Sequence, residues 1–118
     1  MFREVLSEML AKADGALGAV MMGSDGIMVD QVAVEGVGFD PEVVAMELSV
    51  VLREVVKTMK QIDAGRTEEV LIRSSGITAI IRVLTDEYFV AMALKPGANL
   101  GKGRFLLRAA APRLLESL

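Results

Sequence analysis

The side chains that most often carry chemistry in proteins are absent from this sequence. Its 118 residues include no cysteine and no histidine. Zinc and haem sites of the usual kinds, cysteine nucleophiles, disulfides and Ser-His-Asp triads each need one of these two residue types. We therefore expect no catalytic residue, no bound metal, no cofactor and no enzyme activity of the chain's own.

One glycine-rich segment has the composition of a phosphate-binding loop but not its spacing. Residues 97–103 read Gly-Ala-Asn-Leu-Gly-Lys-Gly and lie between an expected strand and an expected helix. The phosphate-binding motif has four residues between its first glycine and its Gly-Lys pair, and then a serine or threonine for Mg²⁺. Here three residues intervene and Gly103 follows the lysine. We interpret the segment as a flexible connection.

The acidic residues are no better placed for catalysis or metal binding. Asp25 and Asp30 do not lie in the twelve-residue loop, closed by a glutamate, that binds calcium. Asp86 and Glu87 are adjacent in an expected turn, where their side chains diverge rather than flank a substrate. Positions in turns and at a strand edge explain all four residues.

The composition is apolar and mildly acidic. Hydrophobic residues make up 53% of the chain, the mean hydropathy is +0.46 and the formal net charge is -3. A nucleic-acid binder needs a basic field, so we expect no RNA or DNA partner. Charges interrupt every apolar run before it could span a membrane, and Arg3, Glu4 and Glu8 do not fit a secretory signal. We expect one cytoplasmic domain over residues 1–118, with some apolar surface buried in an interface.

The chain is organised around one long helix, predicted from Asp40 to Ala64. Asp40 suits the cap, Pro41 suits the first helical position, and Gly65 is expected to end the helix. At 100° per residue, one broad apolar face of this helix is predicted to pack on a sheet. Its members are Val44, Leu48, Val51, Leu52, Val55, Met59 and Ile62.

A second apolar stripe lies on the opposite side of the same helix, where a solvated helix would be polar. Val43, Met46 and Val50 line up there, and Arg53 and Lys57 follow one and two turns later. Single exposed apolar side chains are common on monomers, but three on one face, methionine included, favour a partner site. We assign these five residues to partner binding.

Apolar patterns elsewhere predict an α+β fold with a five-stranded antiparallel sheet. A first helix ends near Asp14-Gly15, and strands are predicted at 16–22, 27–34, 69–74, 77–84 and 88–94. Strands 16–22 and 88–94 are apolar at even and odd positions alike, and therefore on both faces. They belong in the middle of the sheet, and the predicted order is 2-1-5-4-3. The long helix covers one face, and the N- and C-terminal helices cover the other.

Two further features complete the prediction. The last helix opens at Asn99 or Leu100, and Pro112 predicts a kink or a break near Ala109. The third strand lies at a sheet edge, where unpaired backbone groups invite a second copy of the chain. We expect a homodimer whose interface includes Glu69, Leu71 and Arg73.

Three local signatures follow one another along the chain. They are the run from Gly15 to Met22 leading into Ser24-Asp25-Gly26, the strand pair around Ser75-Gly76, and Asn99-Leu-Gly-Lys-Gly-Arg-Phe105 opening the last helix. With the order of elements, they resemble the Roadblock family, which includes dynein light chains and the bacterial MglB proteins. The resemblance covers almost the whole chain.

The resemblance implies an assembly and a class of partner. Roadblock domains are typically dimers whose sheets join edge to edge and whose long helices lie side by side. Bacterial members commonly serve Ras-like small GTPases, and MglB itself is a GTPase-activating dimer. We expect no role that depends on the C-terminal extension of MglB proteins, because the sequence ends at Leu118.

Hypotheses from two classes of function follow. The first is a homodimeric binding module that docks on a Ras-like small GTPase and regulates it, either by activating hydrolysis or as a scaffold that leaves turnover unchanged. The second is a small-molecule sensor, because a five-stranded antiparallel sheet with flanking helices is also the plan of ligand-sensing domains. A sensor needs convergent polar groups in a cavity, and the predicted inward positions are nearly all aliphatic, which favours the first hypothesis.

Overall fold

The computed structural model describes all residues, 1–118, as three helices and one five-stranded antiparallel sheet. The helices are α1 (Phe2–Lys12), α2 (Pro41–Gln61) and α3 (Leu100–Glu116). The strands are β1 (Ala16–Gly23), β2 (Met28–Ala33), β3 (Glu69–Arg73), β4 (Thr78–Val83) and β5 (Tyr88–Leu94). Their order across the sheet is β2-β1-β5-β4-β3, which confirms the predicted α+β class and strand order.

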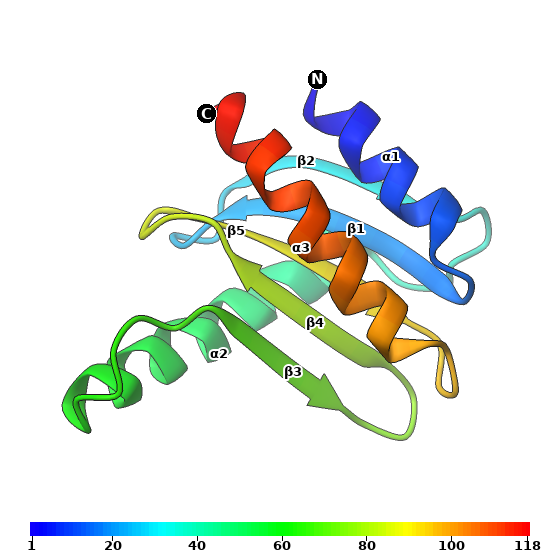
Figure 1. Ribbon diagram of the computed structural model, residues 1–118. Coiled ribbons are helices and arrows are strands. Elements are labelled where there is room, and N and C mark those ends of the chain that lie inside the picture. Colours follow the sequence, from blue (N-terminus) through cyan, green and yellow to red (C-terminus); the bar gives the residue numbers. More distant parts are fainter.

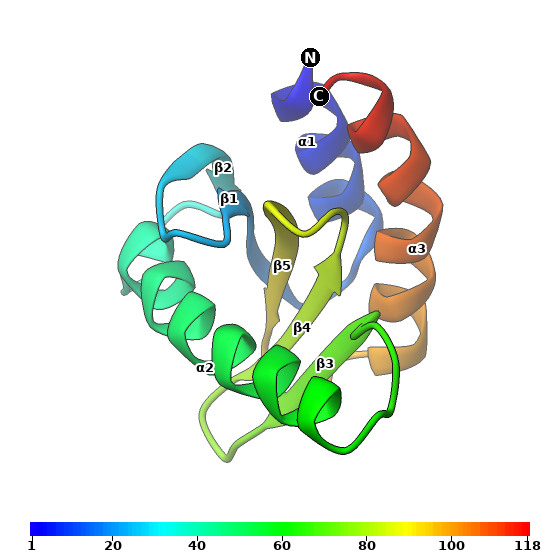
Figure 2. The ribbon, with the colours of Figure 1, turned by 90° about the vertical axis from the view of Figure 1, so that its left-hand side faces the viewer.

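The helices cover both faces of the sheet. α1 and α3 lie together over one face, and α2 crosses the other, as predicted (Figure 1). Figure 2 shows the same layers after a quarter turn, with the two chain ends close together beyond α1 and α3. The apolar strands β1 and β5 pair in the middle of the sheet, where both of their faces are covered.

The face under α1 and α3 carries the larger core. Alternate residues of the central strands point toward it, including Met21, Ile80 and Met92, which are almost completely buried. They share one cluster with Leu6 of α1 and Leu107 of α3. Burying one such side chain contributes about 1.5–3 kcal/mol, so this layer is the main source of stability.

Two ion pairs connect α1 to its neighbours. Arg113 Nη1 of α3 lies 2.6 Å from a carboxylate oxygen of Glu8, and Arg3 Nη2 lies 2.7 Å from Asp30 Oδ1 of β2. Hydrogen bonds from these arginines hold the pKa of Glu8 and the pKa of Asp30 below their ordinary values. Both pairs are open to solvent, so their contribution to stability is small.

Helix α2 begins as predicted and ends earlier than predicted. The carboxylate of Asp40 accepts a hydrogen bond from the amide of Glu42 at 2.9 Å, which caps the first turn. The last helical residue is Gln61, so the predicted end at Ala64, with Gly65 as the terminating residue, is wrong.

A Schellman motif ends α2 before the glycine is reached. Asp63 has φ 54, in the left-handed region. The amide of Ala64 donates to the carbonyl of Met59 at 2.8 Å, and the amide of Asp63 donates to the carbonyl of Lys60 at 3.2 Å. These two bonds define the motif, and an aspartate takes the position that glycine usually occupies.

The rotation of α2 about its own axis also differs from the prediction. Val51 and Ile62, predicted to face the sheet, expose 41% and 63% of their surface. Val44, Val55 and Met59 are half-buried. The residues that do pack on the sheet are Ala45, Leu48, Ser49, Leu52 and Val56, of which Leu48 and Leu52 were predicted to do so.

Small side chains explain this rotation. Ala45 and Ser49 are buried against the sheet, and their size lets the helix backbone approach it closely. The Ser49 hydroxyl donates to the carbonyl of Met46 at 2.6 Å, so the polar group is satisfied within the helix. A helical wheel based on hydrophobicity places the valines toward the sheet, whereas close packing places the small residues there.

Helix α3 continues through Pro112. The side chain of Asn99 caps it by accepting from the amide of Lys102 at 3.1 Å. A kink or a break was predicted near Ala109, and the helix runs unbroken to Glu116, so no break occurs. Arg108, whose carbonyl lacks a donor because of the proline, lies on the exposed side, where solvent can satisfy it.

Candidate functional site

The outer surface of α2 carries the predicted partner-binding stripe. Val43, Met46 and Val50, here called the outer stripe, expose 54%, 47% and 49% of their surface. Ala45 and Ser49 on the other side of the helix are buried, which directs the outer stripe toward solvent. Three large apolar side chains along one helix face form a surface that binding can desolvate.

Arg53 and Lys57 continue the line of the outer stripe but differ in their bonding. Arg53 Nη1 donates to the backbone carbonyl of Ser24 at 2.6 Å and lies 3.5 Å from the Ser49 hydroxyl. The guanidinium is thereby anchored to the turn between β1 and β2. Lys57 is exposed and makes no ion pair, so its charge is available to an external acidic group.

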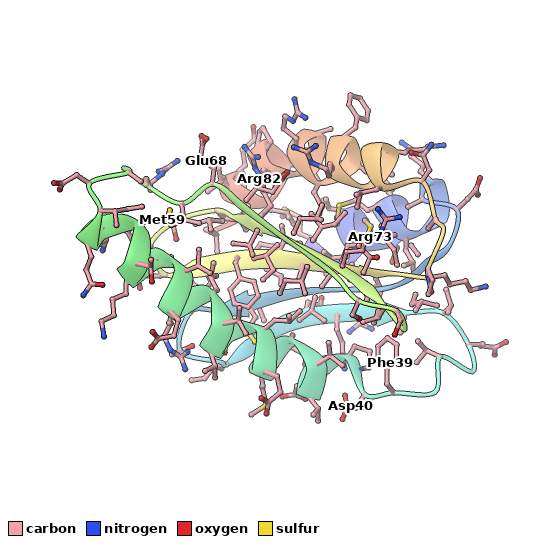
Figure 3. The ribbon with its side chains drawn as sticks, turned by 90° about the horizontal axis from the view of Figure 1, so that it is seen from below. Phe39, Asp40, Met59, Glu68, Arg73 and Arg82 are labelled. Atoms are coloured by element: carbon pink, nitrogen blue, oxygen red, sulfur yellow. The ribbon has the colours of Figure 1, made fainter.

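A second apolar strip on α2 is only partly covered. Val51, Val55 and Ile62, here called the side flank, were predicted to face the sheet and instead lie at its margin. Met59, one turn after Val55, and Glu68 lie at the same end of the molecule (Figure 3), and both line a cavity of about 590 Å³. Of the side flank, Val55 lines this cavity, beside the start of β3.

Strand β3 forms one edge of the sheet, as predicted. It pairs only with β4, so the backbone groups on its other side are open. Leu71 and Arg73 are exposed, and Arg73 makes no ion pair. Glu69 differs, because its carboxylate lies 2.8 Å from Arg104 Nε and 3.9 Å from Arg82 Nη1. Of the three predicted interface residues, Glu69 is already engaged within the chain.

A groove that the sequence did not predict lies beside the C-terminal half of α2. It has a volume of about 540 Å³ and is bounded by α2, by the loop after it, and by β4, β5 and the turn between them. Its basic lining residues are Arg53, Lys57, Lys60 and Arg66, and Asp86 is its only acidic one. The helical periodicity of α2 predicted Arg53 and Lys57 as site residues. No sequence pattern shows that the loop carrying Arg66 folds back toward α2.

No cluster of three or more potential metal-ligating side chains occurs in the structure. None of the helices is both long and apolar enough to cross a bilayer. What the surface of α2 offers is apolar area and positive charge, which are the means of contact with another macromolecule.

Comparison of the sequence with protein-family models and with curated proteins gives no match. Solved structures do match. The crystal structure of MglC from Myxococcus xanthus is 30% identical over 99% of this chain and 98% of that chain, with a TM-score of 0.73. An MglB structure with a tetrameric arrangement is 18% identical over 97% of this chain and 85% of that chain, with a TM-score of 0.86.

A Roadblock/LC7 domain from Streptomyces avermitilis is 12% identical over 97% of this chain and 94% of that chain, with a TM-score of 0.85. These likenesses define the class of fold, a Roadblock domain with the sheet order and helix layers described above. The MglC match adds sequence identity along nearly the full length of both chains. The chain belongs to the Roadblock family.

Proposed function

We propose that this protein is a homodimeric module that docks on a Ras-like small GTPase and regulates it in the cytoplasm. The observation that carries the proposal is the outer stripe, whose large apolar side chains have no cover within the chain. Membership of the Roadblock family supports the class of partner, because bacterial members commonly serve Ras-like GTPases.

The surface of α2 has the arrangement that protein interfaces use. The outer stripe would form the apolar centre of the contact, and Lys57 would meet acidic groups at its rim. Apolar side chains that lose water at the centre carry most of the affinity, whereas rim charges mainly speed association.

The bonding of Arg53 bears on how such a partner would be regulated. Many GTPase-activating proteins insert an arginine that stabilises the charge of the transition state. Arg53 projects from the middle of a helix and donates to the Ser24 carbonyl, a bond it would have to break in order to reach a nucleotide. We expect activation, if the protein activates, to act by repositioning the GTPase's own loops.

Binding is tested by charge insertion into the outer stripe. Met46→Arg should abolish binding to a Ras-like GTPase loaded with a GTP analogue, because it buries an unpaired charge in the contact. Leu115→Arg is the matched control, since Leu115 on α3 is similarly exposed, at 40%. Isothermal titration calorimetry measures both variants. Unchanged binding by Met46→Arg would remove α2 from the interface.

A second variant tests the mode of regulation. Arg53→Ala should weaken binding modestly and leave stimulated GTP hydrolysis largely intact when the GTPase is saturated. Single-turnover hydrolysis separates this outcome from the alternative. Complete loss of stimulation with intact binding would establish Arg53 as an inserted catalytic arginine.

The homodimer in this proposal is supported by two neighbouring features, the open edge of β3 and the uncovered side flank of α2. Pairing of two β3 strands about a two-fold axis would satisfy the open backbone groups near Leu71 and Arg73. The same axis would bring the two side flanks together and remove Val51 and Ile62 from water.

Light scattering and sedimentation test this assembly. Val51→Arg and Arg73→Glu should each shift the protein toward monomer, whereas Leu115→Arg should leave its mass unchanged. A wild-type protein that stays monomeric at tens of micromolar contradicts the homodimer, because mass action favours assembly at that concentration.

A further inference from the structure

The groove beside α2 is both apolar and positively charged. Leu52 and Val56 of α2, Val83 and Phe89 of the sheet are among its lining residues, and Phe89 is completely buried. Three of the four cationic side chains, Arg53, Lys57 and Lys60, follow one another along α2, and Arg66 lies in the loop after it. A ligand for such a groove needs an apolar group to fill it and negative charges to either side.

None of the groove's cations forms an ion pair within the chain. Lys57, Lys60 and Arg66 make no ion pair, and Arg53 bonds to a neutral carbonyl. The C-terminal end of α2 contributes partial negative charge there, which offsets part of this field. Four cations facing the single carboxylate of Asp86 leave a positive excess, on a protein whose net charge is -3. A local field of opposite sign to the whole molecule steers acidic ligands to this place.

A buried hydroxyl in the groove wall also lacks a partner. Thr67 lines the groove, exposes only 8% of its surface, and its Oγ1 makes no hydrogen bond within the protein. Buried hydroxyl groups are almost always hydrogen-bonded, because leaving one unpaired is unfavourable. This oxygen has almost no solvent-accessible surface, so a ligand in the groove can supply the missing bond only when the Thr67 side chain rotates toward it.

The distribution of charge distinguishes a chain from a small anion. Arg53 and Lys60 are separated by about two helical turns, or roughly 10 Å along α2, and Arg66 lies beyond the helix end. One phosphate or carboxylate reaches one or two of these groups, whereas an extended segment reaches all of them. The groove also shares Arg53 and Lys57 with the continuation of the outer stripe.

We propose that the groove binds an acidic segment of a protein partner, in which an apolar side chain lies between two or more carboxylates. The apolar side chain occupies the floor over Leu52 and Val56, and the carboxylates meet Lys57, Lys60 and Arg66. A polar group of the segment pairs with Thr67 Oγ1. The assignment of this segment to the GTPase rests on the proposed function, but the chemistry of the groove does not.

A peptide pair tests the groove directly. The probe is an eleven-residue capped peptide with four glutamates around a central phenylalanine, and its control carries glutamine in place of each glutamate. In ¹⁵N spectra of the full chain, the glutamate peptide should shift the amides of Lys60, Thr67 and Phe89, and the glutamine peptide should not. Shifts with neither peptide, or equal shifts with both, would overturn the proposal. Equal shifts with inorganic phosphate or GTP alone would overturn it in favour of a small-anion site.

Variants then separate the groove from the outer stripe. The double variant Lys60→Glu with Arg66→Glu should weaken partner binding at least about tenfold, mainly through a slower association rate. Lys102→Glu with Arg108→Glu is the control, since it changes the net charge equally at exposed positions of α3 outside the groove. If both double variants bind the GTPase alike while Met46→Arg fails to bind, the groove is empty in the complex and the proposed function stands. If Met46→Arg binds normally, the proposed docking surface fails whatever the groove does.

Thr67→Val gives a readout that a purely structural role would not produce. It keeps the shape of the side chain and removes the unpartnered hydroxyl, so the free protein should be as stable as the parent or more stable. Binding of the glutamate peptide should nevertheless fall about threefold to tenfold. A variant that loses stability and keeps full affinity would show that the hydroxyl serves the fold.

Discussion

The two faces of the sheet are covered to different degrees. Under α1 and α3, 17 buried hydrophobic residues form one cluster, whereas the cluster between α2 and the sheet contains only seven. The reason is geometric, because α2 is a single helix that packs mainly on β1 and β2 and leaves much of β4 and β3 without a helix above them.

This difference assigns the two faces separate tasks. The face under α1 and α3 buries large side chains completely and supplies the free energy that holds the fold. On the other side, α2 leaves apolar side chains uncovered, in the outer stripe and in the side flank, where a second molecule can cover them. Changes on the first face should therefore be measured as stability, and changes on the second mainly as binding.

The largest expected effect is a truncation under α3. Leu107→Ala should lower the free energy of unfolding by about 3–5 kcal/mol, because Leu107 is completely buried and the truncation leaves a cavity in the core. Leu52→Ala under α2 should lower it by about 2 kcal/mol, since its site opens toward the groove and solvent can enter. Urea denaturation measures both variants. An equal or larger loss for Leu52→Ala would contradict the contrast between the faces.

Substitution of a left-handed glycine should also cost more stability in the connection from α1 to β1 than in the connection from α2 to β3. Gly15, between α1 and β1, has φ +84, and an added Cβ would lie 2.7 Å from the Cβ of Ala98. Gly15→Ala should therefore cost about 2–3 kcal/mol through backbone strain and a clash. Gly65, between α2 and β3, has φ +86 but no atom within 4 Å of an added Cβ.

Gly65→Ala is the matched control, with an expected loss of about 1 kcal/mol from the left-handed backbone alone. Thermal melts of the two variants compare a crowded connection with an open one. Similar melting temperatures would show that the connection at Gly15 yields to the added methyl group.

A smaller effect should separate neighbouring residues of α2. Val51→Ala should change the stability of the monomer by no more than about 0.5 kcal/mol, because Val51 faces solvent. Leu48→Ala should cost about 1–2 kcal/mol, since Leu48 is half-buried against the sheet. Denaturation at concentrations below the dimer dissociation constant measures both. A loss for Val51→Ala that matches Leu48→Ala would restore the sheet-facing orientation predicted from the sequence.

The smallest effect concerns the ion pairs around α1. Because the pKa values of Glu8 and Asp30 are lowered in the folded protein, their stabilisation is present above the ordinary carboxyl pKa of about 4 and is lost as the pH falls further. The double variant Glu8→Gln with Asp30→Asn should melt slightly below the parent at neutral pH and together with it in acid. A difference in melting temperature that persists in acid would show that packing, rather than charge, causes it.

The sheet was predictable because its central strands differ from the others in composition. β1 and β5 are apolar on both faces, which placed them in the middle, and the turns at Asp25-Gly26 and Ser75-Gly76 set the pairing of their neighbours. The rotation of α2 was not predictable in the same way. Hydrophobicity places Val51 and Val55 inward, whereas the close approach of Ala45 and Ser49 to the sheet decides the outcome.

The two parts of the candidate site also differ in whether the sequence predicts them. The outer stripe was found from sequence because its residues share one helix, where periodicity relates them. The groove was not found, because Arg66 and Thr67 join α2 residues only after the chain has turned back at Asp63. The missing partner of Thr67 Oγ1 is a property of the folded environment that no sequence pattern expresses.

The pairing of β1 with β5 also has a kinetic consequence. These two strands lie near opposite ends of the chain and pair along nearly their whole lengths, so the centre of the sheet is also its most non-local contact. The hairpins β1–β2 and β3–β4–β5 can form early, but joining them requires closing a long loop before the central contacts are gained. Folding should therefore be slower than that of a helical domain of equal length. During synthesis on the ribosome, the edge of β1 that pairs with β5 stays unpaired until β5 has emerged.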